Sequence, residues 1–268
     1  MTLRRRWLAT AAAAVVLGLG GAQLAGCSAA DAPAVPGSEA GASPAGAQTG
    51  VPTATPSTGV TLSATPSIDP SPSDALRPST RPVDERTGKE LGRPFTVNGI
   101  VVVSAEHPVS AGYRPTIGDF ELTPTAAKAF RAMQRAIEKA GLRLYVVSGY
   151  RSYAEQKALY THRLATMGRA YTRKYVAVPG ASEHQTGLAV DLRSPSGRGT
   201  SFVRTREWRW LRAHAQNYGF VLRYPEGKTK LTGIGFEPWH WRYVGVQQAK
   251  AIRALGADVT IEQYLRLA

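Results

Sequence analysis

Two short stretches of the chain contain the residue types of a metal-dependent hydrolytic site. The first, SEHQTGLAVD, contains His184 and Asp191, and the second, EPWHWRY, contains Glu237 and His240. Imidazole and carboxylate groups are common zinc ligands, and a site with three protein ligands leaves a fourth position for water. His184, Asp191 and His240 are therefore candidate ligands of one zinc ion. Glu237 is the adjacent carboxylate that could act as general base toward a metal-activated water.

The first stretch is expected to form a strand from Gly187 onward. Side chains alternate along a strand, so Asp191 shares a face with two small residues while three aliphatic residues occupy the opposite face. His184 and Asp191 would lie on opposite faces of a regular strand. A shared metal therefore requires a bend between them, which Gly187 permits.

The second stretch alternates three aromatic residues with His240 and Arg242. Pro238 has no backbone N–H to donate, so the regular strand is expected to begin after it. This start leaves Glu237 free to turn toward the His240 side of the strand.

Histidines are usually surface or core residues, and that role is expected for His107, His162 and His214. On spacing alone the metal site is a weak hypothesis, because His240 lies far along the chain from His184 and Asp191. The case depends on further motifs, described below.

The surrounding sequence predicts mixed helices and strands without a regular βαβ rhythm. This pattern favours an α+β fold, with a small antiparallel sheet flanked by helices and the metal in a cleft on the sheet. The expected strands cover residues 98–104, 142–148 and 220–222; the expected helices cover 124–141, 205–218 and 246–255, with two more opening at the capping boxes of Ser152 and Thr260.

The N-terminal segment has the features of an export signal. Three arginines precede a short apolar stretch, which ends in LAGC at Cys27, a sequence that resembles the lipobox of bacterial lipoproteins. Cys27 is the only cysteine, so the chain cannot form an intramolecular disulfide. We therefore expect a signal peptide over residues 1–26 and lipidation of Cys27. The alternative is an ordinary signal peptide that happens to contain a cysteine.

Residues 27–93 are rich in Pro, Ala, Ser and Thr and are expected to be a disordered tether, which leaves one domain over residues 94–268. The charges of the first two segments nearly cancel, so almost all of the net charge of +14 belongs to this domain. For an exported protein the expected polyanions are wall polymers or lipid head groups. The alternative to polyanion binding is that the positive charges are scattered over a solvated surface and have no such partner. Aromatic and basic residues are not interleaved in the pattern that would predict nucleic-acid binding.

Three motifs in order, SGYRSYAEQ, SEHQTGLAVD and EPWHWRY, resemble the VanY-type D-alanyl-D-alanine carboxypeptidases. This family belongs to the LAS group of zinc peptidases, with D-Ala-D-Ala dipeptidases, phage L-alanyl-D-glutamate endopeptidases and the hedgehog signalling domain. The resemblance covers about residues 95–267. One departure is Ser104-Ala105, where family members often have Asn-Lys, and it affects local packing or substrate fit rather than the metal site.

The resemblance implies the D-Ala-D-Ala metallopeptidase-like fold and one Zn²⁺ held by His184, Asp191 and His240. It implies Glu237 as catalytic base and Arg151 as the cation at the scissile carbonyl oxygen. A competing interpretation makes Arg151 a structural ion-pair partner of Asp191 or Glu155.

Two further residues, Gln156 and Ser182, resemble family residues that contact the terminal carboxylate of the substrate. The alternatives are an exposed helix residue for Gln156 and a turn residue for Ser182.

The function implied by the resemblance is removal of the terminal D-Ala from peptidoglycan stem peptides. The enzyme would be a monomer, lipid-anchored at the outer face of the cell membrane. Three alternatives remain: an L-alanyl-D-glutamate endopeptidase or a D,D-dipeptidase on the same metal centre, and an inactive peptidoglycan-binding module.

Overall fold

The computed structural model describes residues 76–267, and the following statements concern that part of the chain. The predicted signal peptide, Cys27 and the larger part of the predicted tether lie outside it. Among the described residues, no helix combines the length and the hydropathy that a membrane span requires.

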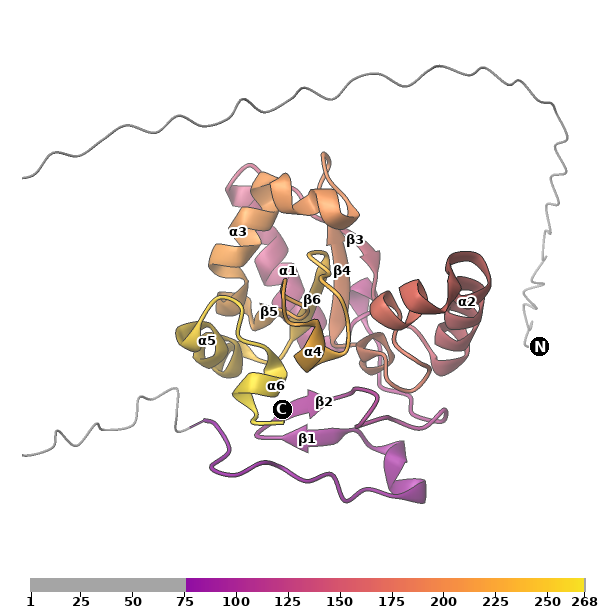
Figure 1. Cartoon of the computed structure of the whole chain (residues 1–268). Coiled ribbons are helices and arrows are strands. Elements are labelled where there is room, and N and C mark those ends of the chain that lie inside the picture. Colours follow the sequence, from indigo (N-terminus) through magenta and orange to yellow (C-terminus); the bar gives the residue numbers. More distant parts are fainter. Residues whose placement is uncertain (1–75, 268) are drawn as a thin grey trace, which may run out of the picture. The chain divides into compact units, whose positions relative to one another are not determined.

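A four-stranded antiparallel sheet is at the centre of the domain (Figure 1). Its strands, in spatial order, are β3 (Tyr145–Ser148), β4 (Ala189–Arg193), β6 (His240–Tyr243) and β5 (Phe220–Leu222). Helices surround this sheet, so the predicted α+β class is confirmed.

The helices include all those predicted, in the predicted order, and one short helix that was not predicted. They are α1 (Pro124–Lys139), α2 (Tyr153–Tyr175), α3 (Arg206–His214), α4 (Thr229–Thr232), α5 (Val246–Leu255) and α6 (Ile261–Tyr264). Short 3-10 helices are η1 (Gly88–Gly92), η2 (Asp119–Glu121), η3 (Glu183–Thr186), η4 (Gly199–Arg204) and η5 (Ala215–Tyr218). In Figure 1, α2 lies on the β3 side of the sheet and α5 on the β5 side.

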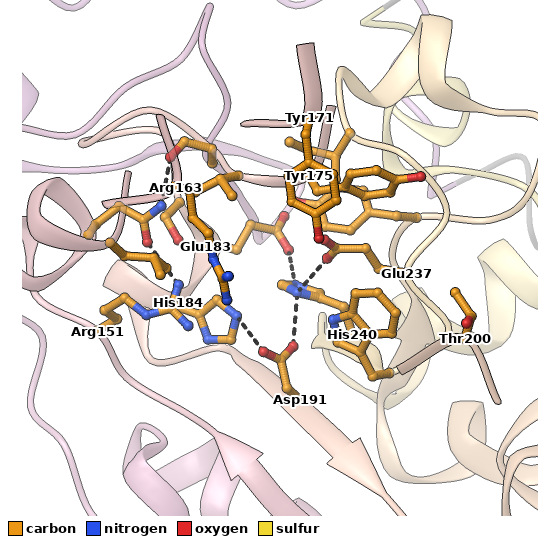
Figure 2. A pocket seen from close by; sticks show the side chains of 18 residues that line it. Arg151, Arg163, Tyr171, Tyr175, Glu183, His184, Asp191, Thr200, Glu237 and His240 are labelled. Carbon is orange, nitrogen blue, oxygen red and sulfur yellow. Dashed lines mark hydrogen bonds and ion pairs between the residues drawn. The ribbon is translucent and has the colours of Figure 1, made fainter. Parts of the chain in front are cut away.

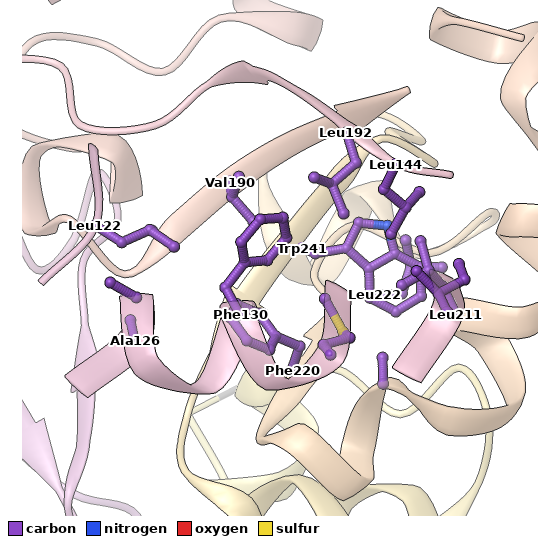
Figure 3. Close-up of a cluster of buried hydrophobic side chains, with 14 of the residues drawn as sticks. Leu122, Ala126, Phe130, Leu144, Val190, Leu192, Leu211, Phe220, Leu222 and Trp241 are labelled. Carbon is purple, nitrogen blue, oxygen red and sulfur yellow. The ribbon is translucent and has the colours of Figure 1, made fainter. Parts of the chain in front are cut away.

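Helix α1 packs its apolar side against one face of the sheet (Figure 3). Phe130 of α1 is fully buried with Val190 and Leu192 of β4 and with Trp241 of β6. Each side chain of this size contributes about 1.5–3 kcal/mol when it leaves water. Because strand side chains alternate, this packing directs Asp191 and His240 to the opposite face.

The strand predicted over residues 98–104 is instead part of a hairpin. β1 (Phe95–Val97) pairs antiparallel with β2 (Ile100–Val102), and Asn98-Gly99 forms the turn with φ values of 48° and 80°. Positive φ at both residues is the requirement of a type I′ hairpin turn, for which Asn-Gly is the preferred sequence. The prediction of a strand here is confirmed by β2, but its bounds were too wide because it counted this dipeptide as part of the strand.

A second core joins this hairpin to α5 and α6, through Ile100, Ile252 and Tyr264 among others. Part of the predicted tether also contacts the domain. The carbonyl of Leu76 accepts a hydrogen bond from Asn98 Nδ2 at 2.9 Å, and Arg77 Nε donates to the carbonyl of Tyr264 at 3.2 Å. The chain therefore makes specific contacts with the domain well before residue 94.

Candidate active site

The register of the sheet brings two of the predicted metal ligands together. Asp191 of β4 lies directly opposite His240 of β6, and Ser148 of β3 is the partner of Asp191 on its other side. Asp191 Oδ1 is 3.3 Å from His240 Nδ1. The two stretches identified in the sequence therefore meet as neighbouring strands.

The predicted bend before β4 brings His184 to the same place. His184 lies in η3, and Gly187 ends this turn in the left-handed conformation with φ of 65°. This conformation favours glycine, and a Cβ atom at Gly187 would also force Ile117 Cδ1, 2.6 Å away, to move. As a result His184 Nε2 lies 3.4 Å from Asp191 Oδ2.

The loop after β3 holds His184 from the other side. The carbonyl of Gly149 is 2.6 Å from His184 Nδ1, and the carbonyl of His184 accepts a hydrogen bond from Arg151 N at 3.1 Å. A Cβ atom at Gly149 would lie 2.5 Å from the carbonyl oxygen of Phe120, so only glycine fits. The Nδ1 contact leaves His184 Nε2 to face Asp191.

The three side chains meet the requirements of a metal site. One ligand atom from each of His184, Asp191 and His240 lies within 4.8 Å of the others. Ligands of a tetrahedral zinc ion, bound at about 2.0–2.1 Å, are about 3.3 Å apart, and each histidine nitrogen lies at about this distance from one of the two carboxylate oxygens of Asp191. Asp191 Oδ1 is also buried, and its one neighbouring donor among the described residues is His240 Nδ1 at 3.3 Å; a bound cation would compensate this oxygen. Two nitrogens and one oxygen are a donor set of catalytic zinc sites, so the residues fit this ion.

Glu237 lies beside this cluster, as its position before Pro238 predicted. Its Oε2 is 3.6 Å from His240 Nδ1, and its backbone N–H donates to the carbonyl of Tyr224 at 3.2 Å. Burial raises the pKa of Glu237 to about 8, although His240 opposes the shift. A carboxyl group with a pKa near neutrality is suited to accept and return a proton.

The charges of the cluster are strongly coupled. Burial would lower the pKa of His240, but hydrogen bonds to Asp191 and Glu183 raise it to about 9. Burial would raise the pKa of Asp191, but His184 and His240 hold it well below its usual range. The metal-free centre is thus a protonated histidine beside an ionised aspartate, and a metal must displace this proton.

Arg151 is the cation next to the cluster. Its Nη1 donates to Gln156 Oε1 at 2.9 Å and its Nη2 donates to Ser148 Oγ at 2.8 Å. Among the described residues it forms no ion pair with Asp191 or Glu155, so the structural ion pair considered from the sequence is not present. Burial lowers the pKa of Arg151, and the charges of Asp191 and Glu237 oppose that shift.

Gln156 and Ser182 both line the same cavity, but their hydrogen bonding differs. The side-chain amide of Gln156 is used at both ends, because Nε2 donates to the carbonyl of Ala177 at 2.6 Å while Oε1 holds Arg151. Gln156 therefore positions Arg151. The hydroxyl of Ser182 forms no hydrogen bond with the rest of the described chain and is available to a ligand.

The cavity has a volume of about 350 Å³ and contains the whole cluster. Figure 2 shows the α2 side chains Arg163, Tyr171 and Tyr175 above the histidines, with Asp191 below them. Arg163 forms no hydrogen bond or ion pair with any residue that the structure describes. The cavity thus offers an unpaired cation in addition to Arg151.

Sequence reasoning missed one buried network behind His240. Glu183 Oε2 is 3.4 Å from His240 Nε2, and Arg223 and Arg242 both donate to Glu183 Oε1. Arg223 also pairs with Glu262 of α6. The signal available was an acidic residue directly before a candidate ligand, within the SEHQTG motif.

Known proteins are similar to this chain in sequence. The family described as VanY, D-alanyl-D-alanine carboxypeptidase, matches residues 119–246. The bifunctional D-Ala-D-Ala dipeptidase and D-Ala-D-Ala carboxypeptidase VanXYC of Enterococcus gallinarum is 36% identical over 184 residues, which are 63% of this chain and 94% of the relative.

Two solved structures extend the likeness to the fold. The LdcB LD-carboxypeptidase is 34% identical with a TM-score of 0.57, over 64% of this chain and 92% of that one. A mutant of the vancomycin resistance D,D-pentapeptidase VanY, solved in complex with Zn(II), is 29% identical with a TM-score of 0.51, over 60% of this chain and 97% of that one. Together with the His-Asp-His cluster, these matches show that the chain is a metallopeptidase of the VanY D-alanyl-D-alanine carboxypeptidase family.

Proposed function

We propose that this protein is a zinc D,D-carboxypeptidase that removes the terminal D-Ala from peptidoglycan stem peptides. The observation that carries the proposal is the His184, Asp191 and His240 cluster with Glu237 beside it, within one cavity of about 350 Å³. Such a volume suits the end of a peptide rather than a folded protein.

His184 would hold zinc through Nε2, His240 through Nδ1, and Asp191 through its carboxylate. The bound ion would lower the pKa of a water molecule to about 7 and polarise the scissile carbonyl. Glu237 accepts the proton of the attacking water and passes it to the leaving amine. Arg151, held by Gln156 and Ser148, stabilises the negative charge that develops on the carbonyl oxygen.

The unpaired groups of the cavity favour a carboxypeptidase over an endopeptidase. A carboxypeptidase must recognise a free terminal carboxylate, and a guanidinium group binds carboxylates in a bidentate way. Arg163 and the hydroxyl of Ser182 both line the cavity without partners in the described chain. An endopeptidase substrate has an amide at this point and would leave Arg163 uncompensated.

An L,D-carboxypeptidase is the second candidate. The observation in its favour is the likeness to the LdcB LD-carboxypeptidase, at 34% identity and a TM-score of 0.57. The two activities release the same product and differ in the configuration of the residue before the scissile bond. The side chains that line the cavity upstream of this bond would decide between them.

The deciding experiment compares stem peptides by mass spectrometry. The zinc-loaded protein is incubated with a pentapeptide ending in D-Ala-D-Ala and, separately, with the tetrapeptide ending in a single D-Ala. The Glu237→Ala variant is the control. Loss of one alanine from the pentapeptide by the wild type alone would support the proposal.

Other products would indicate a different activity. Cleavage of the tetrapeptide alone would indicate the L,D-carboxypeptidase. Release of an Ala-Ala dipeptide would indicate a dipeptidase, and cleavage after L-Ala an endopeptidase. If the zinc-bound protein cleaves none of these peptides, the result would indicate the inactive peptidoglycan-binding module.

We also propose that the protein is exported and anchored through a lipid on Cys27, with peptidoglycan as its partner. The support is the basic, apolar and LAGC segments of the sequence. Metabolic labelling with a radioactive fatty acid should mark the wild type and not the Cys27→Ser variant. Equal labelling of both, or of neither, would contradict the anchor.

A further inference from the structure

Behind the candidate metal centre lies a closed network of four buried charges. Its members are Glu183 in η3, Arg223 after β5, Arg242 in β6 and Glu262 in α6. All four are among the buried residues of the domain. Two positive charges balance two negative ones, so the network is neutral as a whole.

Burial of such a network gives little stability by itself. Removing charges from water costs several kcal/mol for each ion, and apolar side chains of similar volume often stabilise a core equally well. A role beyond stability is therefore suggested by what the network touches, which is His240.

The two carboxylate oxygens of Glu183 have different partners. Oε1 accepts from Arg223 Nε at 2.7 Å and from Arg242 Nη1 at 2.6 Å. Oε2 is left to face His240 Nε2 at 3.4 Å (Figure 2). No other acceptor for this nitrogen is found among the described residues, whereas Nδ1 faces Asp191 and Glu237, so Glu183 is the one described group that can hold a proton on Nε2.

The two arginines are themselves fixed from several sides. Arg223 is held by both oxygens of Glu262, at 3.0 and 2.5 Å, and Arg242 Nη2 donates to the carbonyl of Val101 in β2 at 2.6 Å. The hairpin and the C-terminal helix α6 therefore fix the carboxylate of Glu183 on its far side. They restrain the direction from which Oε2 meets the histidine.

From this geometry we propose that Glu183 is a positioning residue for the metal ligand His240. A neutral imidazole has one N–H and one acceptor nitrogen. Glu183 can only accept, so it holds the proton on Nε2 and leaves Nδ1 free toward Asp191, 3.3 Å away. Carboxylate partners of this kind orient metal-binding histidines, and their loss weakens metal binding about 10–100-fold. The inference rests on the metal centre of the proposed function, not on its substrate.

The Glu183→Gln variant makes the sharpest test. Arg223 and Arg242 need an acceptor, so they take the amide oxygen and turn the NH₂ group toward His240 Nε2. This arrangement favours the proton on Nδ1, the wrong nitrogen for metal binding, as when an aspartate that orients a catalytic histidine is changed to asparagine. Zinc affinity, measured by competition with a chromophoric chelator, should fall about 10–100-fold.

A matched control separates positioning from loss of charge. Glu262→Gln removes one carboxylate from the same network but not the contact with His240. Like Glu183→Gln, it should lower the stability of the protein to urea. Its zinc affinity should differ from the wild type by less than about threefold, which corresponds to about 0.7 kcal/mol. A spectroscopic signature is also expected. The hydrogen-bonded Nε2 proton of His240 should give an exchange-protected NMR signal in zinc-loaded wild type and Glu262→Gln, but not in Glu183→Gln.

If Glu183→Gln does not fold, Glu183→Asp decides the matter. Aspartate keeps the charge for the arginines but is one methylene shorter, so it cannot also reach His240. Zinc should then bind about tenfold more weakly than in the wild type. Zinc binding as tight as wild type in the folded Glu183 variant would overturn the inference. A wild type that binds zinc but cleaves no stem peptide would overturn the proposed function instead.

Discussion

Asp191 of β4 and His240 of β6 face each other as a register pair in the centre of the sheet. A shift of the register by one residue would direct one of the two side chains into the apolar core against α1. The position of the metal centre is therefore set by the same strand pairing that buries Val190 and Trp241. This coupling brings the two side chains together without the help of a metal.

Replacing Glu237 by Gln should strongly reduce turnover and leave zinc binding intact. The amide has nearly the shape of the carboxylate but cannot accept a proton, and loss of a general base typically costs about 10²–10⁴-fold in rate. The kcat for the stem peptide should fall by that factor while zinc content stays at wild-type level. Glu226→Gln, an exposed change nearby in the chain, should leave both unchanged. Retained turnover in Glu237→Gln would remove Glu237 from the mechanism.

The Arg151→Met variant should lose kcat by about 10²–10³-fold, because it removes a positive group from the developing oxyanion. Zinc affinity should change little, since Arg151 is not among the candidate ligands. Steady-state kinetics and metal analysis check both statements. Gln156→Ala, which frees the guanidinium without removing it, should cause a smaller loss of kcat. If Arg151→Met changes only KM, the residue binds substrate rather than the transition state.

The unpaired Arg163 predicts a preference for substrates with a free C-terminus. Wild-type enzyme should cleave a stem peptide with an amidated C-terminus at least about tenfold less efficiently, since a charge-assisted hydrogen bond contributes about 1.5–3 kcal/mol. Arg163→Met should lose most of this discrimination, measured as the ratio of kcat/KM values. Arg169→Met, at an exposed position of α2 just beyond the kink at Gly168, is the control. Discrimination that survives in Arg163→Met would assign carboxylate recognition elsewhere in the cavity.

The metal-free protein should lose stability as the pH rises from about 4.5 to 9, most steeply between about 6.5 and 8, where both Glu237 and His240 contribute. Folding raises the pKa of His240 from 6.5 to about 9 and that of Glu237 from 4.5 to about 8. Both groups bind protons more tightly when folded, so their contributions are complete below the unfolded values and are lost as the pH passes the folded ones. Each such proton gives a slope of up to about 1.4 kcal/mol per pH unit.

Urea unfolding in the presence of a chelator, at several pH values, measures this slope. The Glu237→Gln variant should show a shallower one, because it has lost one of the two groups. Zinc should reverse the trend, since the metal competes with the proton on His240 and binds better at higher pH. A free energy of unfolding that is constant or rises with pH in the metal-free wild type would contradict the pKa shifts.

The local sequence determined much of this protein. Helix α5, strand β5 and the caps at Ser152 and Thr260 lie where composition and spacing placed them. These features depend on neighbours a few residues apart, which a sequence shows directly. The same holds for the alternation that directs Asp191 and His240 away from the apolar face of the sheet.

The tertiary structure decided which groups are paired. Gln156 and Ser182 were equivalent candidates in the sequence, yet only the fold shows that Gln156 is engaged by Arg151 and Ala177 while Ser182 is free. Glu183 and Glu262 are 79 positions apart in the chain and meet only through Arg223. Side-chain spacing encodes the face of an element but not its partner. The partner follows from packing the two cores together, and this packing sets the pKa values and the orientation of His240.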